Sequence, residues 1–174
     1  CPKCGREMRP DTVQSVTDTV LALPHGTRFL VAFPLKMSDE VTHEVVVENL
    51  RAQAFLRLAL DGVVKHLDEL MTEAIDVTFA NEVLLVIERL VVSPDARGRI
   101  ADGVGPAFRE GDGDCVVMRV GSGDGEATSA PPRAPAGKVL RFTEPFECAD
   151  DGTRAPTPTP QLFSFNSPRG ACRR

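Results

Sequence analysis

The sequence predicts an α+β fold, in which a small mixed or antiparallel sheet carries about three packed helices and irregular segments flank it. Three observations favour this class. Apolar residues recur at helical spacing near residues 11–23, near residues 42–53 and after Ser93. Short apolar runs of strand length lie between these segments. Asp61-Gly62 separates two of the runs, as in a two-residue hairpin.

The first helix is expected to begin with a capping box, in which Asp11 is the N-cap and Gln14 occupies position N3. The helix should end near Leu23, because Pro24 follows it. A strand over residues 28–34 comes next.

A second helix is expected over residues 42–53. Its apolar residues at helical spacing are Val46, Val47 and Leu50. A strand over residues 55–60 follows, and three of its leucines are expected to share one face: Leu56, Leu58 and Leu60. Because strand side chains alternate, Arg57 should project from the opposite face.

Asp61-Gly62 predicts a tight turn into a strand over residues 63–67, since both positions of such a turn need positive φ. Residues 68–73 are interpreted as a loop or short turn, and residues 74–79 as a weak strand. The strongest strand signal covers residues 82–92. Its near-continuous apolar character predicts a central strand that is covered on both faces over much of its length.

Ser93-Pro94 predicts the start of a third helix, with a kink or an early end near Pro106. A strand over residues 114–120 follows, and Cys115 within it is interpreted as a buried, small apolar residue. Residues 121–137 are rich in glycine, proline and alanine, so they are expected to form a flexible linker.

The composition argues against several classes of function. A net charge of −5 argues against a surface that binds DNA mainly through phosphates, since such surfaces carry a basic excess. The sequence has no apolar run long enough to predict a membrane span. Five cysteines, an odd number with one CxxC pair, fit a reducing cytoplasm better than a disulfide framework.

The cysteines suggest metal binding. Cys1 and Cys4 lie in a CPxCG element, whose turn points two sulfurs at one metal ion and whose glycine permits a sharp exit. Cys172 follows the turn-forming residues Asn-Ser-Pro-Arg-Gly, and Cys148 lies 24 positions before it, so these two are interpreted as parts of a second site. The alternative that these are unrelated reduced thiols stays open.

Residues 162–172, LFSFNSPRGAC, together with FTEPFEC ending at Cys148, resemble the segment of the UvrA family that enters its first signature-domain zinc module. UvrA proteins are damage-sensing ABC-type ATPases of bacterial nucleotide excision repair. In the family pattern of two CxxC pairs, Asp151 stands in place of the second cysteine, and the fourth would follow Arg174; the chain is therefore expected to be a fragment. The resemblance implies zinc at Cys148 and Cys172, with Asp151 as a substitute ligand.

The passage DTVQSVTDTVLALPHGTR at residues 11–28 resembles the inserted domain with which the UvrA family binds UvrB. The strand sequences AFLRLA and LVIERLVV carry the same resemblance, and they place Arg57 and Arg89 on the two basic positions of that domain that contact UvrB. The resemblance thus implies that both arginines dock UvrB through pairs with carboxylates.

Four parts are expected along the chain. They are a CPxCG knuckle at the end of an ATP-binding part (residues 1–8), a UvrB-binding α+β domain (9–120), the linker (121–137) and the truncated start of a zinc module (138–174). The chain has no Walker A, Walker B or ABC signature motif, so it is not expected to be catalytic alone. In the whole protein, ATP, damaged double-stranded DNA and a second UvrA copy would bind elsewhere.

The predicted function is that of a UvrA-like piece that docks UvrB and so recruits it to damaged DNA. The alternative is a structural zinc-binding module without a UvrB partner. A DNA-binding element is disfavoured by the negative charge.

Overall fold

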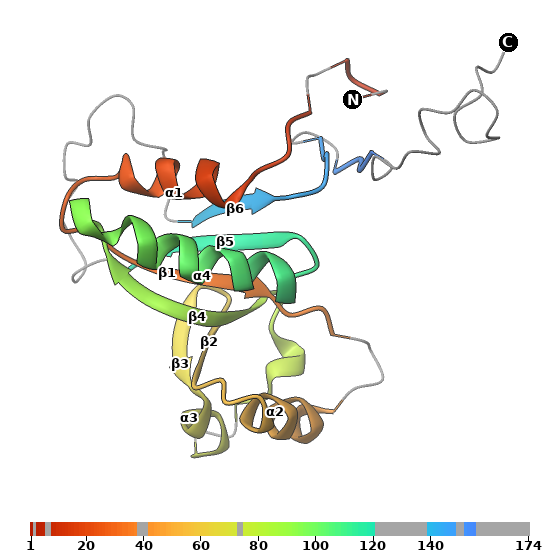
Figure 1. Cartoon of the computed structure of the whole chain (residues 1–174). Coiled ribbons are helices and arrows are strands. Elements are labelled where there is room, and N and C mark those ends of the chain that lie inside the picture. The colour runs from red at the N-terminus through yellow and green to blue at the C-terminus, as the bar shows by residue number, and fades with distance from the viewer. Residues whose placement is uncertain are drawn as a thin grey trace, which may run out of the picture. The chain divides into compact units, whose positions relative to one another are not determined.

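The computed structural model describes residues 1, 3–5, 8–37, 42–72, 75–120, 139–148 and 152–155. The chain divides into two compact units, one formed by Asp11–Glu144 and the other by Cys1–Pro10 together with Pro145–Arg174. The helices and strands of the described residues lie in the larger unit (Figure 1). None of these helices is long and apolar enough to cross a membrane.

The larger unit is built on a six-stranded sheet with the order β3-β2-β4-β1-β5-β6, and its described pairings are antiparallel. The strands are β1 (Arg28–Pro34), β2 (Arg57–Leu60), β3 (Val63–His66), β4 (Val83–Val91), β5 (Asp114–Arg119) and β6 (Val139–Thr143). The helices are α1 (Val13–Leu21), α2 (His43–Ala52), α3 (Leu67–Thr72) and α4 (Arg97–Glu110), with 3-10 turns η1 (Val77–Phe79) and η2 (Pro94–Ala96). The predicted α+β class is confirmed. β6 lies within the stretch that the sequence analysis assigned to the C-terminal part, and it pairs with β5 in this sheet.

α1 begins one residue later than predicted, with Thr12 rather than Asp11 as its N-cap. Thr12 Oγ1 accepts a hydrogen bond from Ser15 N at 3.1 Å, and Ser15 Oγ accepts one from Thr12 N at 2.9 Å. Asp11 instead binds β6: its carboxylate accepts from Thr143 N at 3.0 Å, and its own N–H donates to Thr143 O at 2.8 Å. The capping prediction was wrong because the sheet takes the Asp11 side chain.

Three further elements correct the sequence analysis. α3 occupies the stretch interpreted as a loop, because Leu70 is buried in the core. η1 replaces the predicted weak strand, since Asp76 Oδ1 accepts from both the N and the Oγ1 of Thr78 and bends the backbone. α4 continues through Pro106 to its end at Glu110, because the residues beyond the proline include the fully buried Phe108.

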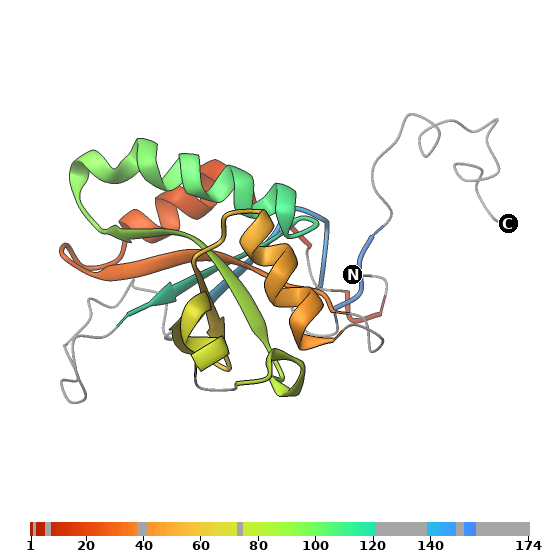
Figure 2. The same cartoon turned by 90° about the horizontal axis from the view of Figure 1, so that it is seen from below.

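The two faces of the sheet bury different side chains. On the helix face, strand residues pack against helical residues in one large cluster that includes Val16, Phe29, Leu58, Ile100 and Phe108. Figure 2 shows α1 and α4 over the same side of the sheet. The second face carries a strand-only cluster: Leu30, Ala32, Ala59, Leu84, Val116 and Met118. The prediction that the leucines of β2 share one face is confirmed in part, since Leu58 is buried whereas Leu56, which precedes the strand, is 58% exposed.

A bidentate ion pair crosses the second face. Arg141 of β6 contacts Glu82, the residue before β4, with Nη1–Oε1 and Nη2–Oε2 distances of 2.6 and 2.8 Å. The hydrogen bond that Arg141 donates to the Glu82 carboxylate raises the pKa of Arg141. β1 and β5 lie between β4 and β6, so a flat sheet with strands about 4.8 Å apart would separate them by roughly 14 Å. The contact therefore indicates that the sheet curls toward its second face, and this curvature helps to bury the strand-only cluster.

Cys115 of β5 is fully buried on the helix face, which confirms its interpretation as a core residue. Burial, with a smaller effect of the Asp11 charge, raises the pKa of the Cys115 thiol to about 12. Because the thiolate is the reactive form, we expect Cys115 to resist iodoacetamide near neutral pH in the native chain and to react after unfolding in urea. Peptide mapping by mass spectrometry would measure this. Equal alkylation in both states would contradict it.

Candidate partner-binding and metal sites

Arg57 and Arg89 lie on the second face of the sheet. Arg57 is two residues before Ala59 in β2, and Ala59 belongs to the strand-only cluster. Arg89 of β4 is directly opposite Leu30 of β1, which belongs to the same cluster. Since strand side chains alternate and opposed residues share a face, both arginines project from this face. Both are exposed.

A β-bulge in β4 places Arg89 on this face. The register between β1 and β4 shifts after Val31: Glu88 is opposite Val31, but Val86 is opposite the next residue. Ile87 is therefore the extra residue, and it packs against the helix-side cluster. Without it, Val86 and Arg89, three positions apart, would project from opposite faces.

The side chain of Glu88 turns to the helix face, where α4 leaves room for it. A Cβ on Gly103 of α4 would lie 3.3 Å from both Cβ and Cγ of Glu88, so glycine permits this close approach. The Glu88 carboxylate also accepts a hydrogen bond from Arg99 Nη2 at 3.2 Å. α4 thus holds the residue that precedes Arg89, which helps to orient Arg89 away from the helices.

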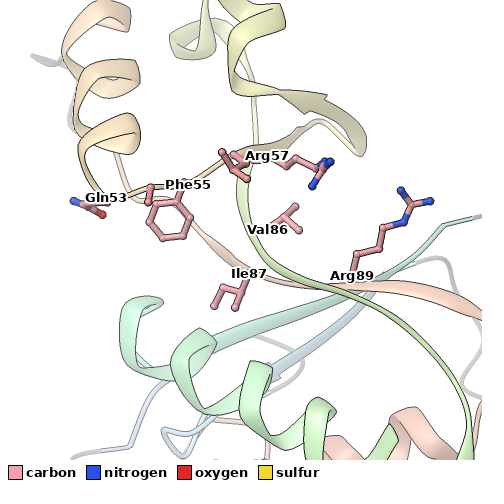
Figure 3. Close-up of a pocket in the computed structure, with 8 residues that line it drawn as sticks. Gln53, Phe55, Arg57, Val86, Ile87 and Arg89 are labelled. Carbon is pink, nitrogen blue, oxygen red and sulfur yellow. The ribbon is translucent and has the colours of Figure 1, made fainter.

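A pocket of about 250 Å³ lies beside the two arginines, between the end of α2, β2 and β4. Its lining residues are Gln53, Ala54, Phe55, Leu56, Arg57, Val86, Ile87 and Arg89. Figure 3 shows Arg57 and Arg89 extending to the same side of the pocket, with Val86 between them. Neither guanidinium has an ion-pair or hydrogen-bond partner in the part of the chain that the structure describes. Both can therefore pair with carboxylates of another molecule.

Three cysteines of the smaller unit lie close together. The Sγ atoms of Cys1, Cys4 and Cys148 all lie within 4.8 Å of one another, and those of Cys4 and Cys148 are 3.5 Å apart. Lys3 N donates a hydrogen bond to Cys1 Sγ at 3.4 Å. Tetrahedral zinc with Zn–S bonds of about 2.3 Å requires sulfurs roughly 3.8 Å apart. The group could therefore hold a metal ion.

The two turns that carry these cysteines share one geometry. Gly5 N donates to Cys1 O at 2.9 Å. Gly152 N donates to Cys148 O at the same distance. Both glycines have positive φ, 73° and 63°, which L-residues rarely adopt. By its position in the repeated Cys-x-x-x-Gly spacing, Asp151 corresponds to the second cysteine of the CPxCG element.

Two predicted metal ligands, Asp151 and Cys172, lie outside the described residues. The sequence predicts a site that contains Cys148 and Cys172, apart from the CPxCG element, whereas the structure brings Cys148 to Cys1 and Cys4. The repeated Cys-x-x-x-Gly spacing is the sequence signal that could have indicated this grouping.

Comparison with known proteins points to one family. A family model described as the UvrA interaction domain matches residues 11–121. Proteins named UvrABC system protein A are similar to almost the whole chain. The Clostridium perfringens protein is 30% identical over 176 residues, which cover 100% of this chain and 17% of that relative.

Two other relatives of the same name give similar values. The Thermus thermophilus protein is 30% identical over 172 residues, covering 99% of this chain and 17% of the relative. The Mycobacterium bovis protein is 35% identical over 173 residues, again covering 99% and 17%. The chain thus spans about 17% of the length of these curated relatives.

Proposed function

Because the chain belongs to the UvrA family by its interaction domain, we propose that the second face of the sheet around Arg57 and Arg89 docks UvrB. The observation that carries this proposal is the pair of exposed guanidinium groups beside one pocket, neither with an ionic partner among the described residues. The same two arginines occupy the basic positions that the family resemblance associates with UvrB.

In this mechanism each guanidinium donates paired hydrogen bonds to a carboxylate of UvrB. The planar fork of arginine fixes the orientation of such a pair, which a lysine could not do. The apolar floor of the pocket, which includes Phe55 and Val86, excludes water around the contact. Truncation of a desolvated interface arginine of this kind costs about 2 kcal/mol or more of binding free energy.

The remaining activity belongs to the whole protein. We propose that the whole protein is a UvrA-type damage-recognition ATPase of nucleotide excision repair, which acts in the cytoplasm. ATP, damaged double-stranded DNA and a second UvrA copy would bind outside these 174 residues, which contain no Walker A motif. Docking at Arg57 and Arg89 would recruit UvrB to the site of damage.

Calorimetric titration of the 174-residue chain with UvrB tests the docking role. We expect saturable binding with an affinity that falls as salt rises, because salt screens the attraction between the arginines and the carboxylates as the two proteins approach. A folded chain that shows no binding to UvrB would refute the proposal. Binding to duplex DNA with a steep salt dependence, in place of UvrB, would favour the DNA-binding alternative.

We further propose that Cys1, Cys4 and Cys148 bind a structural zinc ion, with a fourth ligand from Asp151 or Cys172. The three sulfurs fit because the separation of 3.5 Å between Cys4 and Cys148 is close to the value that tetrahedral zinc requires, and no pair is more than 4.8 Å apart. A zinc ion would cross-link the two segments of the smaller unit and stabilise it. A carboxylate oxygen is a harder ligand than a thiolate, so a site completed by Asp151 would bind zinc more weakly than a four-cysteine site.

Two substitutions with opposite effects test the zinc site. Cys4→Ser is expected to weaken zinc binding by about tenfold or more, because it removes a thiolate ligand. Asp151→Cys is expected to strengthen binding, because it completes a second CxxC pair. Competition with a chromophoric chelator would measure both affinities. Cys115→Ala is the control, since Cys115 lies in the core of the other unit. Zinc affinity unaffected by Cys4→Ser would contradict the site.

A further inference from the structure

A third exposed arginine lies on the same face as Arg57 and Arg89. Arg28, the first residue of β1, is directly opposite Val91 of β4. Leu30, two residues further along β1, is opposite Arg89. Arg28 and Arg89 are therefore diagonal neighbours on one face of the sheet, a relation that usually separates residues by roughly 7–8 Å. Two long side chains at this separation can contact one binding partner.

The guanidinium of Arg28 has no ion-pair or hydrogen-bond partner within the described ranges of the chain. Two other arginines of the sheet are not available to a partner on this face. Arg141 lies on the second face as well, but Glu82 binds it bidentately. Arg119 is opposite the buried Phe29 and so projects toward the helix face. Arg28 is thus available for a partner in the same way as Arg57 and Arg89.

An apolar side chain lies beside these charges. Val91 is directly opposite Arg28, two residues beyond Arg89, and 47% of its surface is exposed. Val86, on the other side of Arg89, lines the pocket next to Arg57. A complementary surface therefore needs carboxylates for the arginines and an apolar side chain to cover the valines between them.

An acidic protein fits this surface better than a nucleic acid. Phosphate binding depends on neutralising many charges, and this chain has a net charge of −5. Proteins that bind single-stranded nucleic acids also use aromatic side chains as stacking platforms, whereas the exposed apolar residue beside Arg28 and Arg89 is Val91. The planar guanidinium of arginine pairs with carboxylates of a protein as well as it pairs with phosphates.

We infer that Arg28 completes a three-arginine docking surface with Arg57 and Arg89, and that its occupant is a UvrB segment with acidic side chains around an apolar one. The inference rests on the proposed function, because UvrB is the occupant proposed there. Arg28 extends the contact from β2 and β4 onto β1, so that the carboxylates held by Arg28 and by Arg89 both lie next to Val91.

The test is calorimetric titration of UvrB with three variants of the 174-residue chain: Arg28→Ala, Arg57→Ala and the control Arg119→Ala. Arg28 and Arg119 lie at the same end of neighbouring strands but project from opposite faces. Arg28→Ala is expected to raise the Kd about tenfold and to reduce its salt dependence. Arg119→Ala is expected to leave the Kd within about twofold of the parent. Thermal unfolding of each variant checks that it is folded.

The outcomes separate this inference from the proposed function. A parent-like Kd for Arg28→Ala, with weakened binding by Arg57→Ala, would overturn the role of Arg28 and leave UvrB docking intact. Equal losses for Arg28→Ala and Arg119→Ala would show a general charge effect and also overturn it. Absence of UvrB binding by the parent chain would overturn the proposed function and this inference together. The same conclusion would follow if the parent chain bound duplex DNA instead of UvrB and Arg28→Ala weakened that DNA binding.

Discussion

Replacing both Arg57 and Arg89 by glutamate is expected to abolish measurable binding of this chain to UvrB. Each guanidinium–carboxylate pair becomes a contact between like charges, which costs more than removal of the side chain. A loss of about 2 kcal/mol at each of two arginines already weakens binding roughly a thousandfold. Calorimetry at constant ionic strength would measure this change.

The matched control is the double variant Arg109→Glu, Arg119→Glu, which changes the net charge by the same amount. Arg109 is exposed on α4, and Arg119 projects toward the helix face, so neither belongs to the proposed surface. This control is expected to bind UvrB as the parent does. Equal losses in the two double variants, or full binding by the Arg57 and Arg89 variant, would contradict docking through these arginines.

Gly111→Ala is expected to destabilise the larger unit by about 3 kcal/mol. Gly111 ends α4 in a buried turn, where its N–H donates to Ala107 O at 2.9 Å. A Cβ at this position would lie 2.2 Å from Asp114 O, 2.7 Å from Ala107 O and 2.8 Å from Phe33 Cβ. Two of these neighbours are backbone atoms, so the turn into β5 must shift. Urea unfolding followed by circular dichroism would measure the loss.

Gly98→Ala in the same helix is the control with the opposite sign. Gly98 is exposed, and a Cβ there meets no atom within 4 Å outside its own stretch of helix. Alanine lowers the backbone entropy cost of a helical position, so this variant is expected to stabilise the unit by about 0.5 kcal/mol. A Gly111→Ala variant as stable as Gly98→Ala would contradict the close packing at the end of α4.

Local chemistry was sufficient for most of the elements. Helical spacing identified α1 and α2, including the buried Val46 and Val47, and the Asp61-Gly62 pair identified the β2–β3 hairpin. Elements that depend on distant contacts were mispredicted. Asp11 was predicted to be an N-cap, but its carboxylate binds β6. Of the two alternatives predicted near Pro106, a kink or an early end, the early end is wrong, because α4 continues and buries Phe108.

For the candidate metal ligands, too, the sequence predicted the local features but not the contacts between distant residues. The sequence identified the individual cysteines, and the family resemblance supplied their chemistry. Which of them share one site depends on how the two ends of the chain fold together within the smaller unit. The structure groups Cys148 with Cys1 and Cys4 because two turns with the same hydrogen bond present their sulfurs to one point.

By itself, the sequence determined an α+β domain of the UvrA family and pointed to Arg57 and Arg89. It could not place these arginines on one face, since strict alternation along β4 separates Val86 from Arg89. The tertiary structure decided this: Ile87 bulges because Glu88 fits against Gly103 of α4, and that packing turns Arg89 to the side of Arg57. It also decided that Arg28, an ordinary strand-start residue in sequence, lies beside them, because only the register of β1 against β4 sets which residues are neighbours across a sheet.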